Sequence, residues 1–114
     1  MTVKWQYDQD AEEPAYAVDW YDNNDTLIDF STGYTFEVKL VSVVTGQTVL
    51  TKTTNITGAA TAPNVAVAWA VGELDVAPDY YEVHLKAITG GRGRVFRRGN
   101  PEIIQIKATA PDVA

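Results

Sequence analysis

The sequence predicts an all-β protein, a sandwich of two antiparallel sheets with about seven short strands. Three observations predict it: apolar and polar residues alternate with a period of two, helical periodicity is weak, and turn residues separate the alternating segments. With 114 residues, 46% of them hydrophobic, the chain is long enough for one domain with its own core. We expect that domain to span residues 1–108, followed by a C-terminal tail over residues 109–114.

The clearest alternation lies in residues 34–40 and 81–87. In the first segment every second side chain is apolar, with Glu37 and Lys39 between them; in the second, His84 falls on the polar face. Strands with one apolar and one polar face are typical of antiparallel sheets. Both segments are therefore predicted strands.

Five shorter segments complete the predicted set. In chain order they are residues 15–21, 47–53, 64–69, 94–97 and 103–108. A tight turn is expected at residues 45–46, because glycine adopts a positive φ at little cost. Residues 8–14 and 54–63 are predicted surface loops, and residues 70–76 are the one place where a helical turn is expected.

Composition excludes several classes of function. Without cysteine there is no thiolate nucleophile and no cysteine-based zinc site. A net charge of −6 argues against nucleic-acid binding, which relies on neutralising phosphates. No apolar run reaches the roughly 18 residues that would span a membrane, and the first residues do not form a signal peptide.

Charge is distributed unevenly along the chain. Residues 1–30 hold eight acidic residues and one basic residue, and residues 31–114 hold seven acidic and eight basic residues. Four of those bases are arginines within one short segment: Arg92, Arg94, Arg97 and Arg98. The acidic segment and the arginines can complement each other between subunits. The alternative is that both are solvated surface that maintains solubility.

No pattern of catalytic or metal-binding residues stands out. His84 is the single histidine and has no evident nucleophile or orienting partner. The run of Asp and Asn over residues 22–25 has calcium-like chemistry but lacks the glycine and glutamate of an EF-hand loop, and such residues are also typical of turns. We therefore expect no enzyme, no cofactor and no metal.

Four aromatic residues lie out of phase with their strands or near a strand end: Trp5, Tyr7, Tyr21 and Tyr80. Exposed Trp and Tyr are enriched in protein interfaces. Anchoring an interface is the favoured role, and ordinary packing and stacking on sugar rings are the alternatives.

The order of several motifs is similar to that of a known family. An early acidic loop ending at Pro14 is followed by the turn at residues 21–25, by Leu27-Ile28-Asp29-Phe30, and later by the entry Pro78-Asp79-Tyr80-Tyr81 into a long strand. The chain resembles, over about residues 8–108, the Ig-like N-terminal domains of the baseplate upper protein family and related minor virion proteins of tailed bacteriophages. Asp25 and Asp79 stand where that family commonly has glycine.

The resemblance implies an Ig-like sandwich and a non-enzymatic structural protein of a tailed phage particle, as a minor tail, baseplate or neck/capsid-surface component. Such a protein would be made in the host cytoplasm and reside in the virion in multiple copies. It would bind other virion proteins and neither nucleic acid nor membrane. The alternative function is a carbohydrate-binding β-sandwich module for host-surface adhesion. The candidate partner-contact residues are Trp5, Tyr7, Asp10, Glu12, Glu13, Tyr21, Arg92, Arg94, Arg97 and Arg98.

Overall fold

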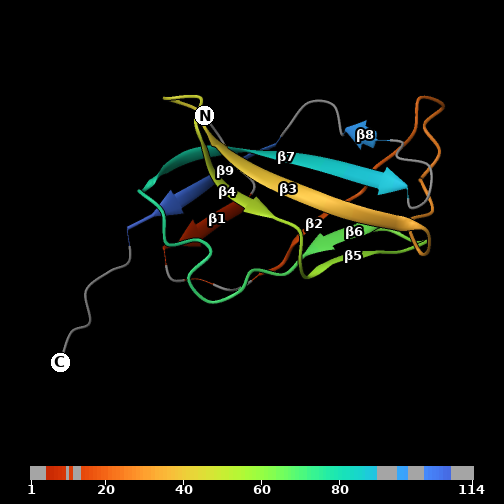
Figure 1. Ribbon diagram of the computed structural model, residues 1–114, viewed down its shortest axis with the longest axis horizontal. Helices are drawn as coiled ribbons and strands as arrows, with labels where there is room; N and C mark the ends of the chain where they lie inside the picture. The colour runs from red at the N-terminus through yellow and green to blue at the C-terminus, as the bar shows by residue number, and fades with distance from the viewer. Residues whose placement is uncertain (1–4, 10, 12–13, 90–94, 98–101, 109–114) are drawn as a thin grey trace.

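The computed structural model describes residues 5–9, 11, 14–89, 95–97 and 102–108 (Figure 1). These residues form strands and no helix, which confirms the predicted all-β class. The larger sheet has the strand order β1-β9-β7-β3-β4, with β8 also paired to β7, and the smaller sheet has the order β2-β6-β5. The larger sheet contains β1 (Trp5–Asp8), β9 (Glu102–Lys107), β7 (Asp79–Thr89), β3 (Tyr34–Ser42), β4 (Thr48–Lys52) and β8 (Val95–Arg97). The smaller contains β2 (Tyr16–Val18), β6 (Val65–Val67) and β5 (Ile56–Gly58).

This strand order is that of an Ig-like sandwich. The small sheet corresponds to strands B, E and D of that fold, and β3, β7 and β9 correspond to C, F and G. A tyrosine corner accompanies it: the hydroxyl of Tyr81, near the start of β7, donates a hydrogen bond to the backbone carbonyl of Ala77. Burial and the negative charge of Asp79 raise the pKa of Tyr81, so its phenol remains a donor.

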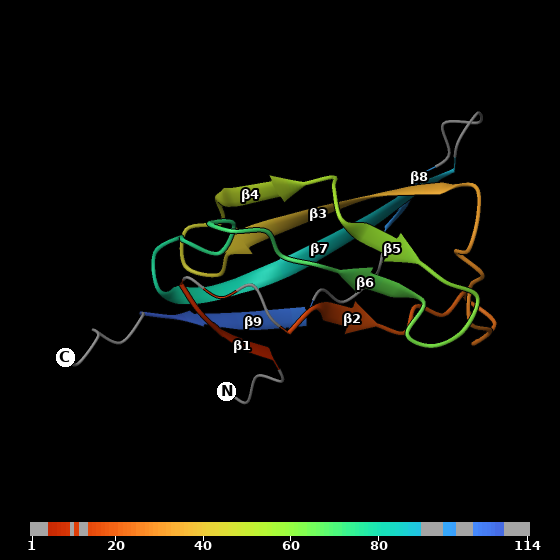
Figure 2. The same ribbon diagram turned by 90° about the horizontal axis from the view of Figure 1, so that it is seen from below.

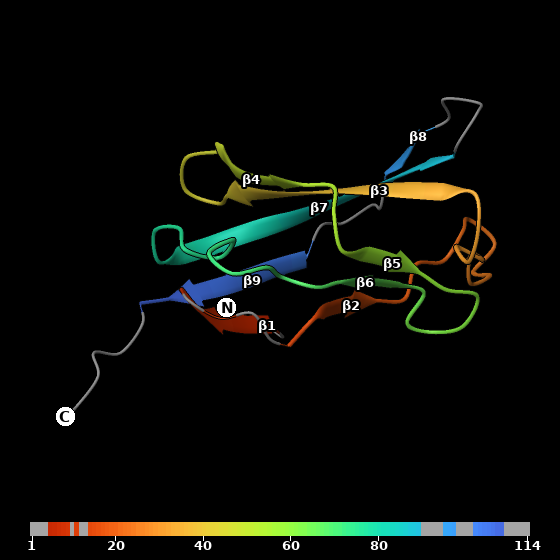
Figure 3. The same ribbon diagram turned by 60° about the horizontal axis from the view of Figure 1, so that its bottom comes forward.

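The two central strands are those with the clearest alternation. β3 and β7 pair over nine residues in antiparallel register, with Phe36 opposite Ala87 and Val38 opposite Leu85. These four side chains are buried between the sheets, whereas the alternate positions carry the polar outer face. Figures 2 and 3 show β3 and β7 running the length of the molecule, with the small sheet covering one half of them.

Three local predictions are wrong. Residues 5–8 form β1, which pairs with β9 in parallel, so the larger sheet is not purely antiparallel. The predicted loop over residues 54–63 contains the three-residue strand β5. Residues 70–76 form consecutive turns instead of a helical turn: the Glu73 amide donates to the Ala70 carbonyl, and the Asp75 amide donates to the Gly72 carbonyl. Gly72 lies within the first of these turns and has φ +82°. β1 and β5 are short, and β1 pairs with a strand almost a hundred residues away, so local patterns carry little signal for them.

Tyr7 is buried rather than exposed. The side chains of β1 point alternately toward the core and toward solvent. In the parallel pairing with β9, Tyr7 lies opposite Ile106 on the core side, and 2% of its surface is exposed. Its ring meets Trp69 edge to face at a centroid distance of 5.9 Å. Burial raises the pKa of Tyr7, and a contact with the Trp69 indole N–H partly opposes that rise. The interpretation of Tyr7 as an exposed contact residue is therefore wrong, and it belongs to the core.

Candidate functional site

Of the ten candidate contact residues, only Tyr21 lies clearly at the surface of the described structure, with 50% of its area exposed. Trp5 is half-buried, stacked on Tyr7 and edge-on to Tyr16. Arg97 lies in β8 opposite Lys86, but its side chain falls outside the description. The remaining predicted residues lie outside the described part of the chain: Asp10, Glu12, Glu13, Arg92, Arg94 and Arg98.

Tyr21 belongs to loop 19–33, the connection from β2 to β3 at one end of the sandwich. Tyr21 and Leu27 form an isolated antiparallel bridge, and Asp22 closes the turn between them. The Asp22 Oδ1 atom accepts hydrogen bonds from the amides of Asn24 at 2.8 Å and Thr26 at 3.0 Å. Asp25 has φ +58°, a conformation that Asp adopts more readily than most residues. The Asp and Asn residues therefore build the turn itself.

Loop 19–33 is attached to the core through Asn64, which is fully buried. The Asn64 Nδ2 group donates to the carbonyls of Trp20 and Ile28, both at 2.8 Å, and its Oδ1 atom accepts from the Trp20 amide at 2.7 Å. These three hydrogen bonds satisfy the buried Asn64 side chain and fix the loop at two points, Trp20 and Ile28. The sequence pattern placed Asn64 at the start of the predicted strand 64–69 and gave no sign of this role.

A second attachment of loop 19–33 to the core lies at Phe30. The Phe30 amide donates to the carbonyl of Ala59 at 3.1 Å. Gly58 abuts Phe30 so closely that a Cβ atom there would lie 2.2 Å from the Phe30 carbonyl oxygen. Only glycine fits this approach, which explains a glycine inside β5.

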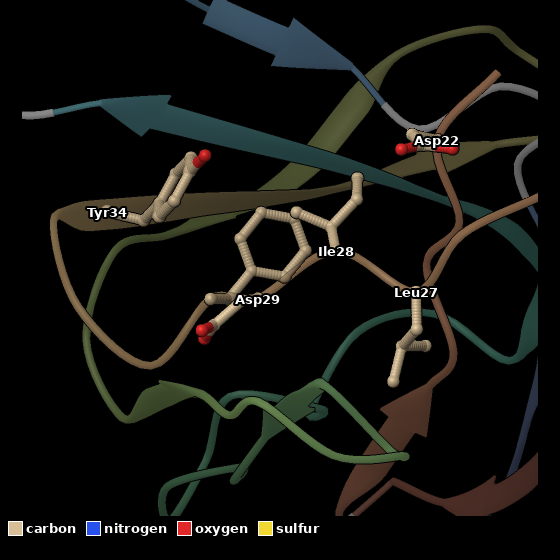
Figure 4. A pocket seen from close by; sticks show the side chains of 6 residues that line it. Asp22, Leu27, Ile28, Asp29 and Tyr34 are labelled. Carbon is tan, nitrogen blue, oxygen red and sulfur yellow. The ribbon is translucent and has the colours of Figure 1, made fainter. Parts of the chain in front are cut away.

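A depression of about 350 Å³ opens on loop 19–33. It is lined by Asp22, Leu27, Ile28, Asp29, Phe30 and Tyr34. Figure 4 shows Ile28 between the carboxylates of Asp22 and Asp29, with Tyr34 to one side. The Phe30 ring, itself buried, meets the Tyr34 ring at a perpendicular angle with 4.8 Å between centroids. The floor of the depression is thus apolar and aromatic, and two carboxylates flank it.

The carboxylate of Asp29 is stabilised in its charged form. Its Oδ1 atom accepts hydrogen bonds from the Ser31 hydroxyl at 2.6 Å and the Ser31 amide at 2.9 Å. These bonds lower the pKa of Asp29 below its ordinary value. Residues 19–34 contain four aspartates and no basic residue, so this segment is negatively charged at neutral pH.

The opposite end, formed by the hairpin between β3 and β4, has a different character. Val43 and Val44 in the turn and Val49 in β4 are 44%, 77% and 40% exposed. Gly46 closes the turn at φ +73° with its amide donating to Ser42, as the sequence predicted for residues 45–46. No charged residue occurs between residues 43 and 51. The hairpin segment 43–51 is therefore uncharged, with three exposed valines.

β4 is also an edge strand. Within the described residues it pairs only with β3, so its other side carries backbone groups that no strand completes. Its one charged residue, Lys52, is not available to protect the edge, because its side chain is fully buried. The Lys52 Nζ atom bonds both carboxylate oxygens of Glu73, at 2.8 and 3.0 Å, and Glu73 Oε1 also accepts the Ala70 amide. This ion pair ties β4 to the turn before β7.

The outer face of the larger sheet is a conventional polar surface. Glu37 lies 3.3 Å from Lys86 on the neighbouring strand and 3.7 Å from Lys39 on its own. The prediction that His84 lies at the surface is confirmed; it is exposed, 3.2 Å from Glu82. Across the described ranges, no three histidine, aspartate or glutamate side chains gather as a metal site, and no helix is long and apolar enough to cross a membrane.

No protein-family model, no curated protein and no solved structure matches this chain. The candidate surfaces are therefore defined by this structure alone: the depression on loop 19–33 at one end, and the β4 edge with its valine-rich turn at the other.

Proposed function

We propose that this chain is a non-enzymatic structural protein of a tailed phage particle, present in multiple copies and acting through contacts with other virion proteins. The observation that carries the proposal is the open edge of β4. Exposed edges normally carry charges, prolines or covering segments that prevent strand addition. Here residues 43–51 carry no charge, and the only lysine of β4 is buried against Glu73.

Such an edge suits strand addition by a neighbouring protein. An added strand gains main-chain hydrogen bonds along β4, and apolar side chains beside it supply further contact area. Val49 on the strand and Val44 in the turn are exposed at that position. An assembly component that is always covered in the particle can retain such an edge, because the partner protects it from aggregation.

Incorporation into particles tests the proposal. In lysates of the phage that encodes the chain, purified particles are expected to contain it in multiple copies, by quantitative mass spectrometry. The variant Val49→Lys/Thr51→Lys, supplied in place of the wild type, is expected to be incorporated at least tenfold less, because charge on an edge strand opposes pairing.

The matched control is Thr35→Lys, an exposed threonine on the outer face of the central strand β3. It adds one of the two charges of the edge variant to the same sheet, away from the edge, and it should be incorporated like the wild type. Absence of the chain from particles refutes the virion assignment. Normal incorporation of the edge variant refutes the role of β4.

A carbohydrate-binding module is the second candidate function. Tyr21 is half exposed and bridges to Leu27, which lines the depression, so an aromatic ring stands near a small concave site. Aromatic rings stack on sugar faces. Binding on a glycan array that disappears in Tyr21→Ala would support this candidate.

A further inference from the structure

We propose that the depression on loop 19–33 receives an arginine side chain presented by a partner protein. This inference rests on the proposed function, because it names the chemistry of one partner. It concerns the end of the sandwich opposite to the β4 edge, as Figure 3 shows, and so it has its own test.

The lining of the depression determines the class of ligand. Leu27, Ile28, Phe30 and Tyr34 supply aliphatic and aromatic surface, and the carboxylates of Asp22 and Asp29 flank it. A ligand that matches both parts has an apolar stem and a positive charge. Arginine fits better than lysine, because its guanidinium is planar, weakly hydrated and able to lie against an aromatic ring such as Tyr34.

Each flanking carboxylate retains an oxygen for such a ligand. The Oδ1 atom of Asp22 is engaged by the Asn24 and Thr26 amides, and that of Asp29 by Ser31. In the described structure no donor bonds the Oδ2 atom of either residue. The loop's own hydrogen bonds therefore orient both carboxylates before a partner arrives, and this lowers the entropic cost of binding.

The size and charge of the site favour one side chain over a sugar chain. At about 350 Å³ the depression is near the lower limit of small-molecule sites, which run from roughly 300 to 1,000 Å³. The four aspartates of residues 19–34, with no basic residue among them, attract a cation but add nothing to the binding of a neutral sugar. Charge complementarity thus selects a basic protein segment as the occupant.

The test uses NMR titration of the full ¹⁵N-labelled chain with a blocked hexapeptide that contains two adjacent arginines. We expect a dissociation constant on the order of 1 mM, as for contacts through one or two side chains. The amides of Ile28, Phe30 and Tyr34 should shift, and the shifts should weaken in 0.5 M salt. The same peptide with citrulline, which is isosteric but neutral, should bind at least tenfold more weakly.

Two variants locate the binding site. Asp22→Asn/Asp29→Asn is expected to weaken binding at least tenfold, while the asparagine oxygens still accept the loop's own amide hydrogen bonds. Asp8→Asn is the matched control, since Asp8 is an exposed aspartate on β1 at the other end of the sandwich, and it should bind like the wild type. The amide spectrum of each variant verifies its fold.

Several outcomes would overturn the inference. Equal binding of the citrulline peptide, shifts confined to another surface, or no shift at 10 mM peptide would each do so. Salt-insensitive shifts of the same amides with a neutral oligosaccharide would assign the depression to sugar instead. None of these results affects the particle experiment, which probes β4.

Discussion

Loop 19–33 and the β3–β4 hairpin, at opposite ends of the sandwich, differ in charge, in the residues that stabilise them and in the kind of contact that they offer. Loop 19–33 is acidic and attached through a neutral buried side chain, Asn64. The β3–β4 hairpin is uncharged and apolar at its surface, and a buried ion pair between Lys52 and Glu73 stabilises it. The same pair of long strands, β3 and β7, reaches both ends (Figure 1).

The comparison suggests how a small domain can contact two different neighbours. A strand edge offers main-chain hydrogen bonds, which any extended segment of suitable length can complete. A charged depression offers side-chain recognition, which discriminates between partners by charge. The two proposed contact surfaces lie at opposite ends of the sandwich, so a partner bound at one would not obstruct the other.

The largest expected effect is at the loop end. Asn64→Ala removes three buried hydrogen bonds and leaves the Trp20 amide and the Ile28 carbonyl without this partner. We expect a loss of about 4 kcal/mol in the free energy of unfolding, since each buried polar group left unsatisfied costs roughly 1–3 kcal/mol. Urea denaturation measures the loss. Asn23→Ala, at an exposed position in the same loop, is the control and should change stability by less than about 0.5 kcal/mol. A small effect of Asn64→Ala would mean that the loop is attached mainly by other contacts.

At the hairpin end, the two partners of the ion pair should respond unequally. Glu73→Gln leaves the fully buried Lys52 ammonium without its counter-charge, at an expected cost of about 3 kcal/mol. Lys52→Met should cost only about 1 kcal/mol, because Glu73 is partly exposed and keeps the Ala70 amide as a donor. Thermal and urea denaturation of both variants measure the asymmetry. Equal losses would show that the pair acts only through its mutual attraction.

The tyrosine corner stabilises the same end more weakly. Tyr81→Phe removes the hydrogen bond to the Ala77 carbonyl while preserving the packed ring. We expect a loss of about 1.5 kcal/mol, the typical cost of one buried hydrogen bond whose acceptor is left unpaired. Tyr80→Phe, on the neighbouring half-exposed residue, is the control and should be close to neutral in urea denaturation. If the two variants are equally stable, the corner contributes nothing beyond its ring.

Much of the fold was predictable because its largest strands follow a local rule. In β3 and β7 the side chains alternate between the core and solvent, so the period of two is visible without knowing the partner strand. β1 and β5 lack that advantage. β5 has only three residues, one of them Gly58, whose close approach to Phe30 is a tertiary contact that no local pattern encodes.

The candidate site was less predictable for the same reason. The exposure of Tyr21 follows from its place in the loop after β2, but the burial of Tyr7 depends on a parallel pairing with β9, almost a hundred residues away. Asn64 acts on residues 36 and 44 positions distant, and the depression exists only because Tyr34 meets the loop. The open β4 edge is likewise a property of sheet order, which a sequence pattern does not specify.

The smallest expected effect concerns the pKa of Asp29 in loop 19–33. The Ser31 hydroxyl and amide stabilise the charged form of Asp29, so the pKa of that carboxyl is lower in the folded chain than in the unfolded one. A group of this kind contributes to stability above its unfolded pKa, and the contribution is lost as the pH falls through the folded pKa. Carboxyl-detected NMR titration should therefore place the pKa of Asp29 below the ordinary value of an aspartate. Ser31→Ala removes the hydroxyl donor and keeps the amide, so it should move the pKa of Asp29 only part of the way back. A full return of the Asp29 pKa to its ordinary value would show that the Ser31 hydroxyl alone lowers it. An unchanged pKa would show that the Ser31 amide alone lowers it.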